Sequence, residues 1–383
     1  MKENVMERRK RLRTDEKVSA FMQKQHLPYN LKVRHAAIRA REFVDECALR
    51  GVNYHVSVGG LDSITLLLFL RSIHIDAPVI SSSHLEDVSI QRIHRELGVE
   101  RLKPLVRETR NGKPVYWTKR TVIQEFGFPV LSKEIAGKID LLQHPSEKNA
   151  TVRHAIITGE TGEYGGNRTG TRMKLAQKWL EKFGGYENER EGTCYGCPNF
   201  KVSEKCCYYL KEKPGDNWAK EHNSVPFLGL MASEGGRRAK SLKENGCNYW
   251  GASTVRSCPF AIFDRQDLLR LALDLHVPVP AIYGTIERGA DGKLYTTGAQ
   301  RTGCSMCGFG IHLEKRPHRF DRLRERNPKE WDFLMYRLCK DPDGTEYGWG
   351  RVLSYIGVEW ETPYQEGVTG QLDLFGGGGN DEL

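Results

Sequence analysis

The sequence lacks a hydrophobic run long enough to cross a membrane. Its longest such run, Ile64–Leu70, is far shorter than the roughly 20 residues that a membrane-spanning helix needs. The opening stretch, Met1–Arg13, is rich in charge and has no apolar segment of the kind that marks a secretory signal. From these absences we expect a soluble, cytoplasmic protein with no membrane partner.

The composition is that of an ordinary globular protein with a basic excess and ten cysteines. The 383 residues, 39% hydrophobic and 28% charged, are enough for one large domain or two modest ones. Lysine and arginine (58) outnumber aspartate and glutamate (49), and the net charge of +9 suits polyanionic ligands or nucleic acid without identifying one. In a cytoplasmic chain, so many cysteines favour metal or iron–sulfur ligation over disulfides.

The most informative segment is Tyr54–Leu70, which predicts a short strand, a glycine turn and a buried helix. Gly59 and Gly60 have no Cβ, so the backbone can turn sharply and approach a ligand closely. Asp62 and Ser63 fall where the helix begins, and there free N–H groups and the helix dipole favour an anion. The segment predicts a phosphate cradle, and an ordinary strand-to-helix turn is the alternative.

The run Ser57–Ser63 (SVGGLDS) resembles the SGGxDS phosphate loop of the adenine-nucleotide alpha-hydrolase superfamily. That superfamily includes ATP pyrophosphatases and the sulfonucleotide (PAPS/APS) reductases. Val58 replaces the first serine of the pattern, and Leu61 stands where many reductases have lysine. The resemblance implies that ATP, PAPS or APS binds here, with Mg²⁺ in the case of ATP. The implied contacts are Ser57, Gly59, Gly60, Asp62 and Ser63.

Patterns typical of alternating strands and helices follow this loop. Strand patterns at 77–81 and 101–106 alternate with helix patterns at 90–97 and 118–126. Such alternation predicts an α/β fold with a doubly wound parallel sheet, whose ligands bind beyond the carboxyl ends of the strands. Along the chain we expect an N-terminal helical segment (1–50), a nucleotide-binding domain (51–320) with an irregular Cys-rich insertion (about 161–213), a helical C-terminal region (321–366) and a disordered tail (367–383).

Two cysteine pairs resemble elements of the APS reductases. The adjacent pair Cys206-Cys207 looks like their CC…K…P segment, and Cys304-x-x-Cys307 looks like their later CxxC. In that family the two elements bind a [4Fe–4S] cluster beside the sulfate end of the nucleotide, where four thiolates must converge on one small volume. The resemblance therefore implies Cys206, Cys207, Cys304 and Cys307 as cluster ligands.

A third pair, Cys194-x-x-Cys197, leaves a competing assignment open. Together with Cys304-x-x-Cys307 it has the spacing of a structural zinc ribbon. In a mixed set, Cys194 or Cys197 would replace one member of the adjacent pair. We favour the iron–sulfur interpretation, with zinc as the alternative cofactor.

Two further segments resemble nucleotide contacts of the same family. The stretch that begins at Gly229 resembles its G-x-R-x-x-E-S-x-x-R pattern, which implies that the backbone approaches the phosphates while Arg237 and Arg238 hold them. Two exposed arginines on a helix are the alternative. The stretch Ser81–Glu86 occupies the place of the family's TGxExPE strand end. The resemblance implies that Glu86 contacts the adenosine half of the nucleotide. A solvated carboxylate at a helix start is the alternative.

One element of the thioredoxin-coupled reductases, a nucleophilic cysteine in an ECGxH context, is missing. The only late cysteine, Cys339, lacks that context, and we interpret it as structural. We therefore expect a PAPS reductase-like enzyme of sulfur metabolism, either an oxidoreductase or an ATP pyrophosphatase/sulfurtransferase, with its cluster used in sulfur or redox chemistry. The alternative is a nucleotide- and DNA-associated binding protein without turnover that holds a structural zinc.

The tail contains a separate motif, Gln371-Leu372-Asp373-Leu374-Phe375. It resembles the short peptide by which bacterial DNA-polymerase accessory proteins bind the sliding clamp. A flexible peptide of this kind places its leucine and phenylalanine in an apolar pocket. The motif predicts clamp binding through Gln371, Leu374 and Phe375, and with the positive charge it suggests a link to DNA or to nucleic-acid modification.

Overall fold

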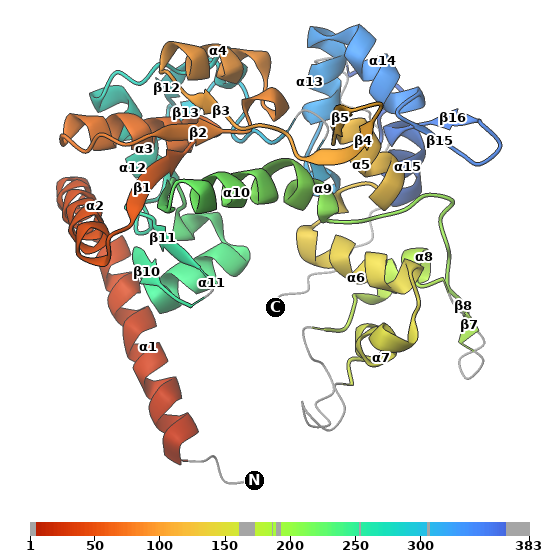
Figure 1. Cartoon of the computed structure of the whole chain (residues 1–383), viewed down its shortest axis with the longest axis horizontal. Coiled ribbons are helices and arrows are strands. Elements are labelled where there is room, and N and C mark those ends of the chain that lie inside the picture. The colour runs from red at the N-terminus through yellow and green to blue at the C-terminus, as the bar shows by residue number, and fades with distance from the viewer. Residues whose placement is uncertain are drawn as a thin grey trace. The chain divides into compact units, whose positions relative to one another are not determined.

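A computed structural model of the protein divides into two compact units (Figure 1). The first unit is Met1–Lys119 with Cys207–Cys307, and the second is Arg120–Cys206 with Gly308–Leu383. The structure describes residues 5–160, 173–185, 187–188, 193–252, 254–304 and 307–364, and for residues 5–13, 187–188, 193–194 and 237 the backbone alone.

The first unit is built on a mostly parallel sheet in the order β10-β11-β9-β1-β2-β3. The pairs β1–β2, β1–β9, β2–β3 and β9–β11 are parallel, and β10 runs antiparallel to β11. The predicted α/β class with a largely parallel central sheet is thus confirmed. The strands are β1 (Asn53–Ser57), β2 (Val79–Ser81), β3 (Glu100–Arg101), β9 (Ser224–Leu228), β10 (Asn248–Trp250) and β11 (Val255–Ser257).

The strand order reverses at β1, which places β2 and β3 on one side and β9 and β11 on the other. In open parallel sheets, ligands bind beyond the carboxyl ends of the strands at such a reversal. Gly59 follows the end of β1 and Gly229 follows the end of β9, so these two glycines lie at this edge. The strand expected at 101–106 is limited to Glu100–Arg101, where Pro104, which has no N–H to donate, follows closely.

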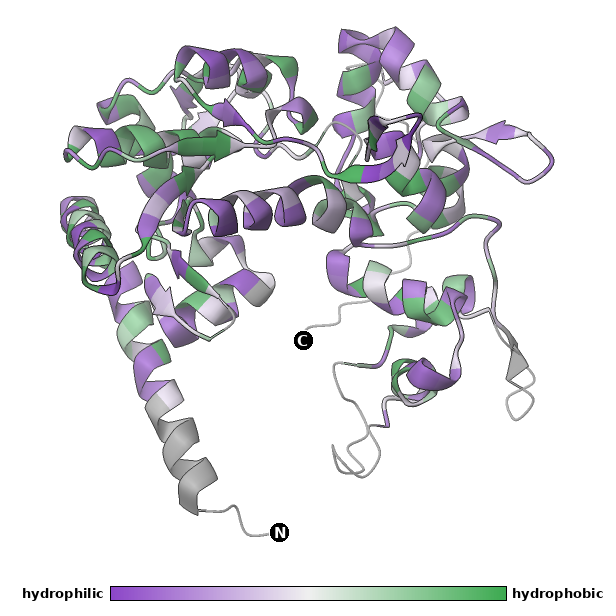
Figure 2. Cartoon of the chain, in the orientation of Figure 1, coloured by the Kyte–Doolittle hydropathy of each residue, from purple (hydrophilic) through white to green (hydrophobic). Residues whose placement is uncertain are grey.

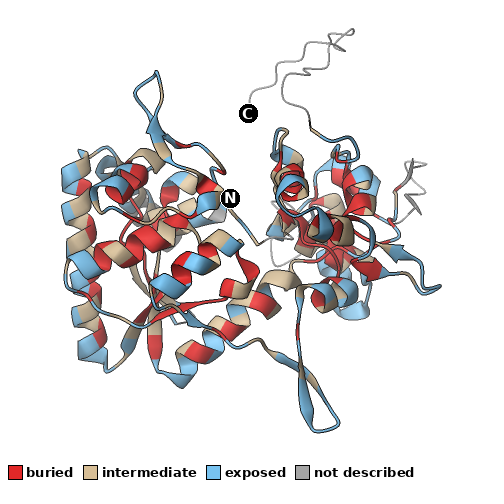
Figure 3. Ribbon diagram, turned by 90° about the horizontal axis from the view of Figure 1, so that it is seen from above, coloured by how far each residue is buried: buried red, intermediate tan, exposed pale blue. Residues whose placement is uncertain are grey.

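Helices pack on both faces of this sheet. Neighbouring residues of a strand point to opposite faces. Val56 of β1 belongs to the main core, together with α2, α3 and α12. The ring of His55 lies 5.1 Å from that of Trp218 on α10, across the other face. Buried residues run along the strands (Figure 3), and Figure 2 shows the hydrophobic character of α3. The helices named here are α2 (Tyr29–Arg50), α3 (Leu61–Ser72), α10 (Lys213–Glu221) and α12 (Arg265–Asp274).

Shorter elements complete the first unit. A two-stranded hairpin of β4 and β5 and another of β12 and β13 stand outside the main sheet. The remaining elements are α1 (Val5–Gln25), the 3₁₀ helix η1 (Ser83–Leu85), α4 (Val88–Glu96), β4 (Val106–Arg110), β5 (Lys113–Tyr116), the π-helix η3 (Tyr208–Glu212), the 3₁₀ helix η4 (Ala232–Glu234), α11 (Gly236–Asn245), the 3₁₀ helix η5 (Ala281–Tyr283), β12 (Ile286–Arg288) and β13 (Leu294–Thr296).

The second unit is mainly helical around an aromatic core. Phe128 packs edge-on against Trp349 with ring centroids 4.9 Å apart, and Phe200 packs similarly against Tyr355 at 5.4 Å. Its elements are α5 (Lys119–Phe126), β6 (Val130–Leu131), α6 (Lys133–Gln143), η2 (Glu147–Asn149), α7 (Ala150–Thr158), α8 (Gln177–Phe183), β7 (Glu187–Asn188), β8 (Thr193–Cys194), α9 (Lys205–Cys207, which reaches the boundary), β14 (Gly308–Phe309), η6 (Ile311–Leu313), α13 (Arg319–Arg326), α14 (Pro328–Tyr336), β15 (Cys339–Lys340), β16 (Glu346–Tyr347) and α15 (Trp349–Ile356).

None of the helices in the described ranges has both the length and the apolar character required to cross a membrane.

Candidate functional site

The two glycines of the loop after β1 play different parts. Gly60 precedes α3 with φ −82° and ψ −164°, a conformation open to any residue. A Cβ on Gly60 would nevertheless lie 2.2 Å from Tyr283 Oη and 3.0 Å from Thr302 Oγ1, so close packing requires the glycine. A Cβ on Gly59 would meet nothing nearer than Glu86 Oε1 at 3.6 Å. Gly60 therefore packs against the protein, whereas Gly59 leaves room beside Glu86.

A buried tyrosine holds the first turn of α3. Tyr283, only 3% exposed, accepts a hydrogen bond from the Leu61 N–H at 3.1 Å and lies 2.6 Å from Thr302 Oγ1. Burial raises the pKa of Tyr283, so its hydroxyl stays neutral. Since Leu61 is taken by the tyrosine, helix geometry leaves the N–H groups of Asp62 and Ser63 as the first-turn donors for an anion.

Ser63 and His94 fix the backbone of the loop. The Ser63 hydroxyl accepts from the Gly59 N–H at 2.7 Å and donates to the Gly60 carbonyl at 3.0 Å. The Gly59 carbonyl lies 2.8 Å from His94 Nε2, and His94 Nδ1 lies 2.8 Å from Ser83 Oγ. A carbonyl can only accept, so Nε2 carries the proton and Nδ1 accepts from Ser83. Burial lowers the pKa of His94, which keeps the ring neutral.

Asp62 faces cations from two other segments. Arg265, at the start of α12, donates to Asp62 Oδ1 at 2.7 Å and to the Gln300 carbonyl at 3.1 Å. The Asp62 side chain is 32% exposed. Burial raises the pKa of Asp62, Arg265 and Arg301 act against that rise, and Glu234 adds to it. The first turn of α3 thus combines N–H donors with a carboxylate and two arginines.

A lysine brings a predicted cluster ligand to the loop. Lys211 Nζ donates to Glu86 Oε1 at 2.6 Å, and the Glu86 side chain is 5% exposed. Lys211 also hydrogen-bonds Cys304. Burial alone would lower the pKa of Lys211, but Cys304 and Glu86 outweigh burial and raise it. Glu86 also borders Gly59. A continuous series of contacts therefore links Gly59 through Glu86 and Lys211 to Cys304 within the first unit.

Gly229 allows the end of β9 to pack closely against the first turn of α3. A Cβ at this position would lie 2.9 Å from Ser63 Cα and 3.0 Å from the Asp62 carbonyl oxygen. The end of β9 can therefore approach the first turn of α3 only without a side chain. Ser57, the last residue of β1, lies between β2 and β9 at the same edge.

The two predicted arginine contacts lie on α11. Arg238 pairs with Glu234 at 2.8 Å, and the Glu234 side chain is 9% exposed. For Arg237 the structure describes the backbone alone. Because Glu234 also influences the pKa of Asp62, Arg238 belongs to the same charged neighbourhood as the loop.

The predicted cluster ligands lie on two short segments. Cys206 and Cys207 end α9, and the boundary between the units falls between them. Cys307 donates its N–H to the Cys304 carbonyl at 2.9 Å. Within the described part of the chain, no group of three or more histidine, cysteine, aspartate or glutamate side chains is arranged to hold a metal ion.

The remaining predicted residues lie elsewhere. Of the alternates, Cys197 is exposed in the second unit, and for Cys194 in β8 only the backbone is described. Cys339 is fully buried, and burial raises its pKa to about 12, in keeping with a structural role. The residues predicted to bind the sliding clamp, Gln371, Leu374 and Phe375, lie outside the described residues.

Comparisons with protein-family models, with curated proteins and with solved structures gave no match. The physical evidence for a function therefore lies in the loop and the side chains around it.

Proposed function

We propose that the first unit is a doubly wound domain of the adenine-nucleotide alpha-hydrolase type, which binds ATP or a sulfonucleotide at the loop Gly59–Ser63. The observation that carries this proposal is the position of the loop. It follows β1, where the strand order reverses. It also opens a helix whose first-turn N–H groups could bind an anion. The contacts of Asp62 with Arg265 and of Glu86 with Lys211 bring two cations close to the loop.

The arrangement suits catalysis by positioning and electrostatics. In the ATP reaction the loop would hold the leaving pyrophosphate while the α-phosphate is attacked. Arg265 and the amides of Asp62 and Ser63 are the groups that can stabilise the developing negative charge. Mg²⁺ usually takes one or two carboxylates together with phosphate oxygens. Asp62, one-third exposed, is the carboxylate that fits this role.

We further propose a [4Fe–4S] cluster, with Cys206, Cys207, Cys304 and Cys307 as ligands and zinc as the alternative metal. The contact of Lys211 with Cys304 supports this, because a cation beside a cysteine is a setting in which metal-ligating thiolates occur. When bound, the cluster would supply sulfur or redox chemistry close to the nucleotide. The alternates remain Cys194 and Cys197.

Metal analysis tests the cluster directly. Protein purified without oxygen should be coloured and contain iron and acid-labile sulfide, and Cys304→Ser should lose most of the iron. Cys339→Ser is the matched control, since Cys339 is buried in the second unit, and it should retain the iron. Colourless wild-type protein with stoichiometric zinc would remove the iron–sulfur proposal and favour the structural-zinc alternative.

Pyrophosphate release from ATP, with and without DNA, tests the nucleotide reaction. Arg265→Gln should slow release about tenfold or more, because a charge-assisted hydrogen bond is worth about 1.5–3 kcal/mol. Arg270→Gln is the control, because Arg270 lies on the same helix and stacks on Tyr29 at 4.1 Å. ATP binding without pyrophosphate release would instead support the second candidate, a nucleotide- and DNA-associated binding protein without turnover.

The tail motif gives a separate test of the link to DNA. Immobilised sliding clamp should retain the wild-type chain. The double substitution Leu374→Ala, Phe375→Ala removes the two side chains that would fill the apolar pocket of the clamp. Equal retention of both proteins would eliminate the proposed clamp partner and leave the nucleotide site unaffected.

A further inference from the structure

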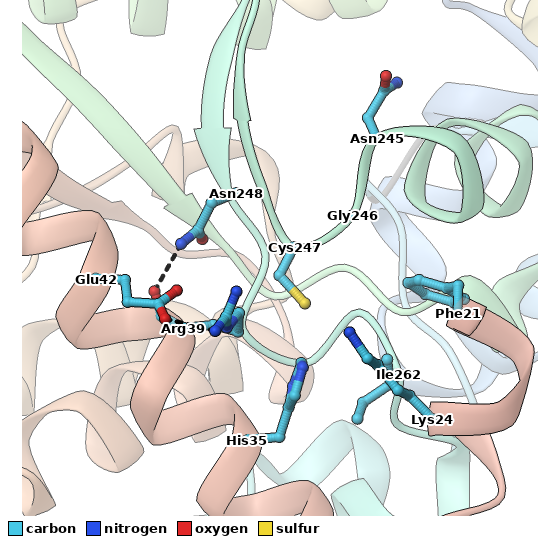
Figure 4. A pocket seen from close by; sticks show the side chains of 10 residues that line it. All are labelled: Phe21, Lys24, His35, Arg39, Glu42, Asn245, Gly246, Cys247, Asn248 and Ile262. Carbon is cyan, nitrogen blue, oxygen red and sulfur yellow. Dashed lines mark hydrogen bonds and ion pairs between the residues drawn. The ribbon is translucent and has the colours of Figure 1, made fainter. Parts of the chain in front are cut away.

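The first unit contains a cavity away from the loop, formed by α1, α2 and the turn that leads into β10 (Figure 4). Its volume of about 210 Å³ is many times the space that one water molecule needs. Its lining shares no residue with the loop site described above. Its polar lining residues are Lys24 of α1, His35, Arg39 and Glu42 of α2, Asn245 at the end of α11, Cys247 of the turn and Asn248 at the start of β10.

Two buried nitrogen atoms of this lining, Arg39 Nε and His35 Nδ1, have no hydrogen-bond partner among the described residues. Two other groups of Arg39 are hydrogen-bonded. Its Nη2 pairs with Glu42 Oε1 at 2.5 Å, and its carbonyl accepts from Asn248 Nδ2 at 2.8 Å. The Arg39 side chain as a whole is 35% exposed, but a buried donor without an acceptor is costly, so its Nε has an unmet demand for an acceptor.

The cavity has a net positive character. In Figure 4, Lys24, His35 and Arg39 converge around the Cys247 sulfur. Burial raises the pKa of Cys247 to about 12, so the thiol adds no negative charge, and the charge of Glu42 is matched by Arg39. Burial, followed by Lys24 and Arg39, lowers the pKa of His35 to about 4, so its ring is neutral at pH 7.

We propose that this cavity binds a small oxyanion, a molecule whose sulfate-, phosphate- or carboxylate-type oxygens accept hydrogen bonds from Arg39 and His35 beside the ammonium of Lys24. The proposal is independent of the nucleotide site. An anion here would offset the positive field of Lys24 and Arg39 at His35, so the ring would take up a proton on binding. Affinity for the anion should therefore increase as the pH falls from 8 to about 5.

Calorimetry on the full chain, at constant ionic strength in chloride, tests the site. Sulfate is the first probe, because its charge is constant over this pH range, and acetate is the second. Sulfate preference would indicate a tetrahedral anion, and acetate preference a carboxylate. Arg39→Gln should weaken binding about tenfold or more, as expected when a charged donor is lost. His35→Gln should retain binding and lose most of its pH dependence.

Arg41→Gln is the matched control, since it removes the same charge from an exposed position of the same helix outside the cavity. Its affinity for the probes should stay within about twofold of wild type. If Arg39→Gln does not fold, Lys24→Gln, at an exposed position at the rim, tests the same charge. Absence of binding of both probes to the wild type, or equal losses in Arg39→Gln and Arg41→Gln, would overturn the proposal.

Discussion

Replacing Gly60 with alanine tests how the loop packs against Tyr283. The new Cβ would lie 2.2 Å from Tyr283 Oη, far inside van der Waals contact, and 3.0 Å from Thr302 Oγ1. The backbone of Gly60 is extended and accepts alanine without strain. The cost therefore comes from the contact alone. We expect Gly60→Ala to lower the free energy of unfolding of the first unit by about 1–3 kcal/mol.

The structure also provides a rescue and a control for this substitution. Tyr283→Phe removes the clashing hydroxyl and leaves Tyr283 Cζ at 3.5 Å, an ordinary contact. In that background Gly60→Ala should cost at least about 1 kcal/mol less, a coupling typical of residues in contact. Gly59→Ala should change the free energy of unfolding by less than about 0.5 kcal/mol, because its Cβ meets no atom closer than 3.6 Å.

Native-state hydrogen exchange is the suitable assay, because a chain of two units need not unfold in a single step. Amide protons of β1 and α3 report the free energy of opening the first unit. Equal protection in Gly60→Ala and Gly59→Ala would refute the packing argument. Simple additivity of Gly60→Ala and Tyr283→Phe would refute it as well.

Two further predictions concern buried charge. Lys211→Met leaves the nearly buried Glu86 carboxylate without its cation. Because the lysine is partly exposed, the expected loss in the free energy of unfolding of the first unit is about 1–3 kcal/mol. Adding Glu86→Gln should recover most of this loss, as measured by hydrogen exchange. Burial, followed by His222, lowers the pKa of His55 to about 4 from 6.5. As the pH falls, His55 becomes protonated in the unfolded chain before it does in the folded one. The free energy of unfolding is therefore highest above pH 6.5 and falls by up to about 3 kcal/mol towards pH 4. His55→Asn should flatten the pH profile measured by hydrogen exchange, and an unchanged profile would contradict this account.

Sequence patterns were sufficient where the signal is local. The strand, turn and helix of 54–70 follow from residue order alone, because apolar periodicity and paired glycines act within a few residues. The parallel character of the sheet followed from alternating patterns around them. The strand expected at 101–106 was too long, because its length depends on sheet neighbours and on Pro104.

Long-range contacts could not be predicted in the same way. Gly60 needs to be glycine because of Tyr283, and Asp62 pairs with Arg265, although more than 200 residues separate the partners in each case. His94 gave no signal, since a lone histidine in a helix pattern is commonly a core residue. The only local hints were Thr302, two positions before Cys304, and Lys211, within the CC…K…P segment. The roles of Thr302 and Lys211 depend on which residues lie near them in the folded chain, and a single sequence does not reveal those neighbours.

The affinity of the chain for ATP in Gly59→Ala is the most direct test of the proposed nucleotide site. The protein's own atoms leave room for the added methyl group, so any loss of affinity reports the ligand and not the fold. Gly215→Ala, in α10 with no atom near its Cβ, is the control. We predict that Gly59→Ala binds ATP at least about tenfold more weakly while Gly215→Ala binds like wild type. Unchanged affinity in Gly59→Ala, or no ATP binding by the wild type, would contradict the account.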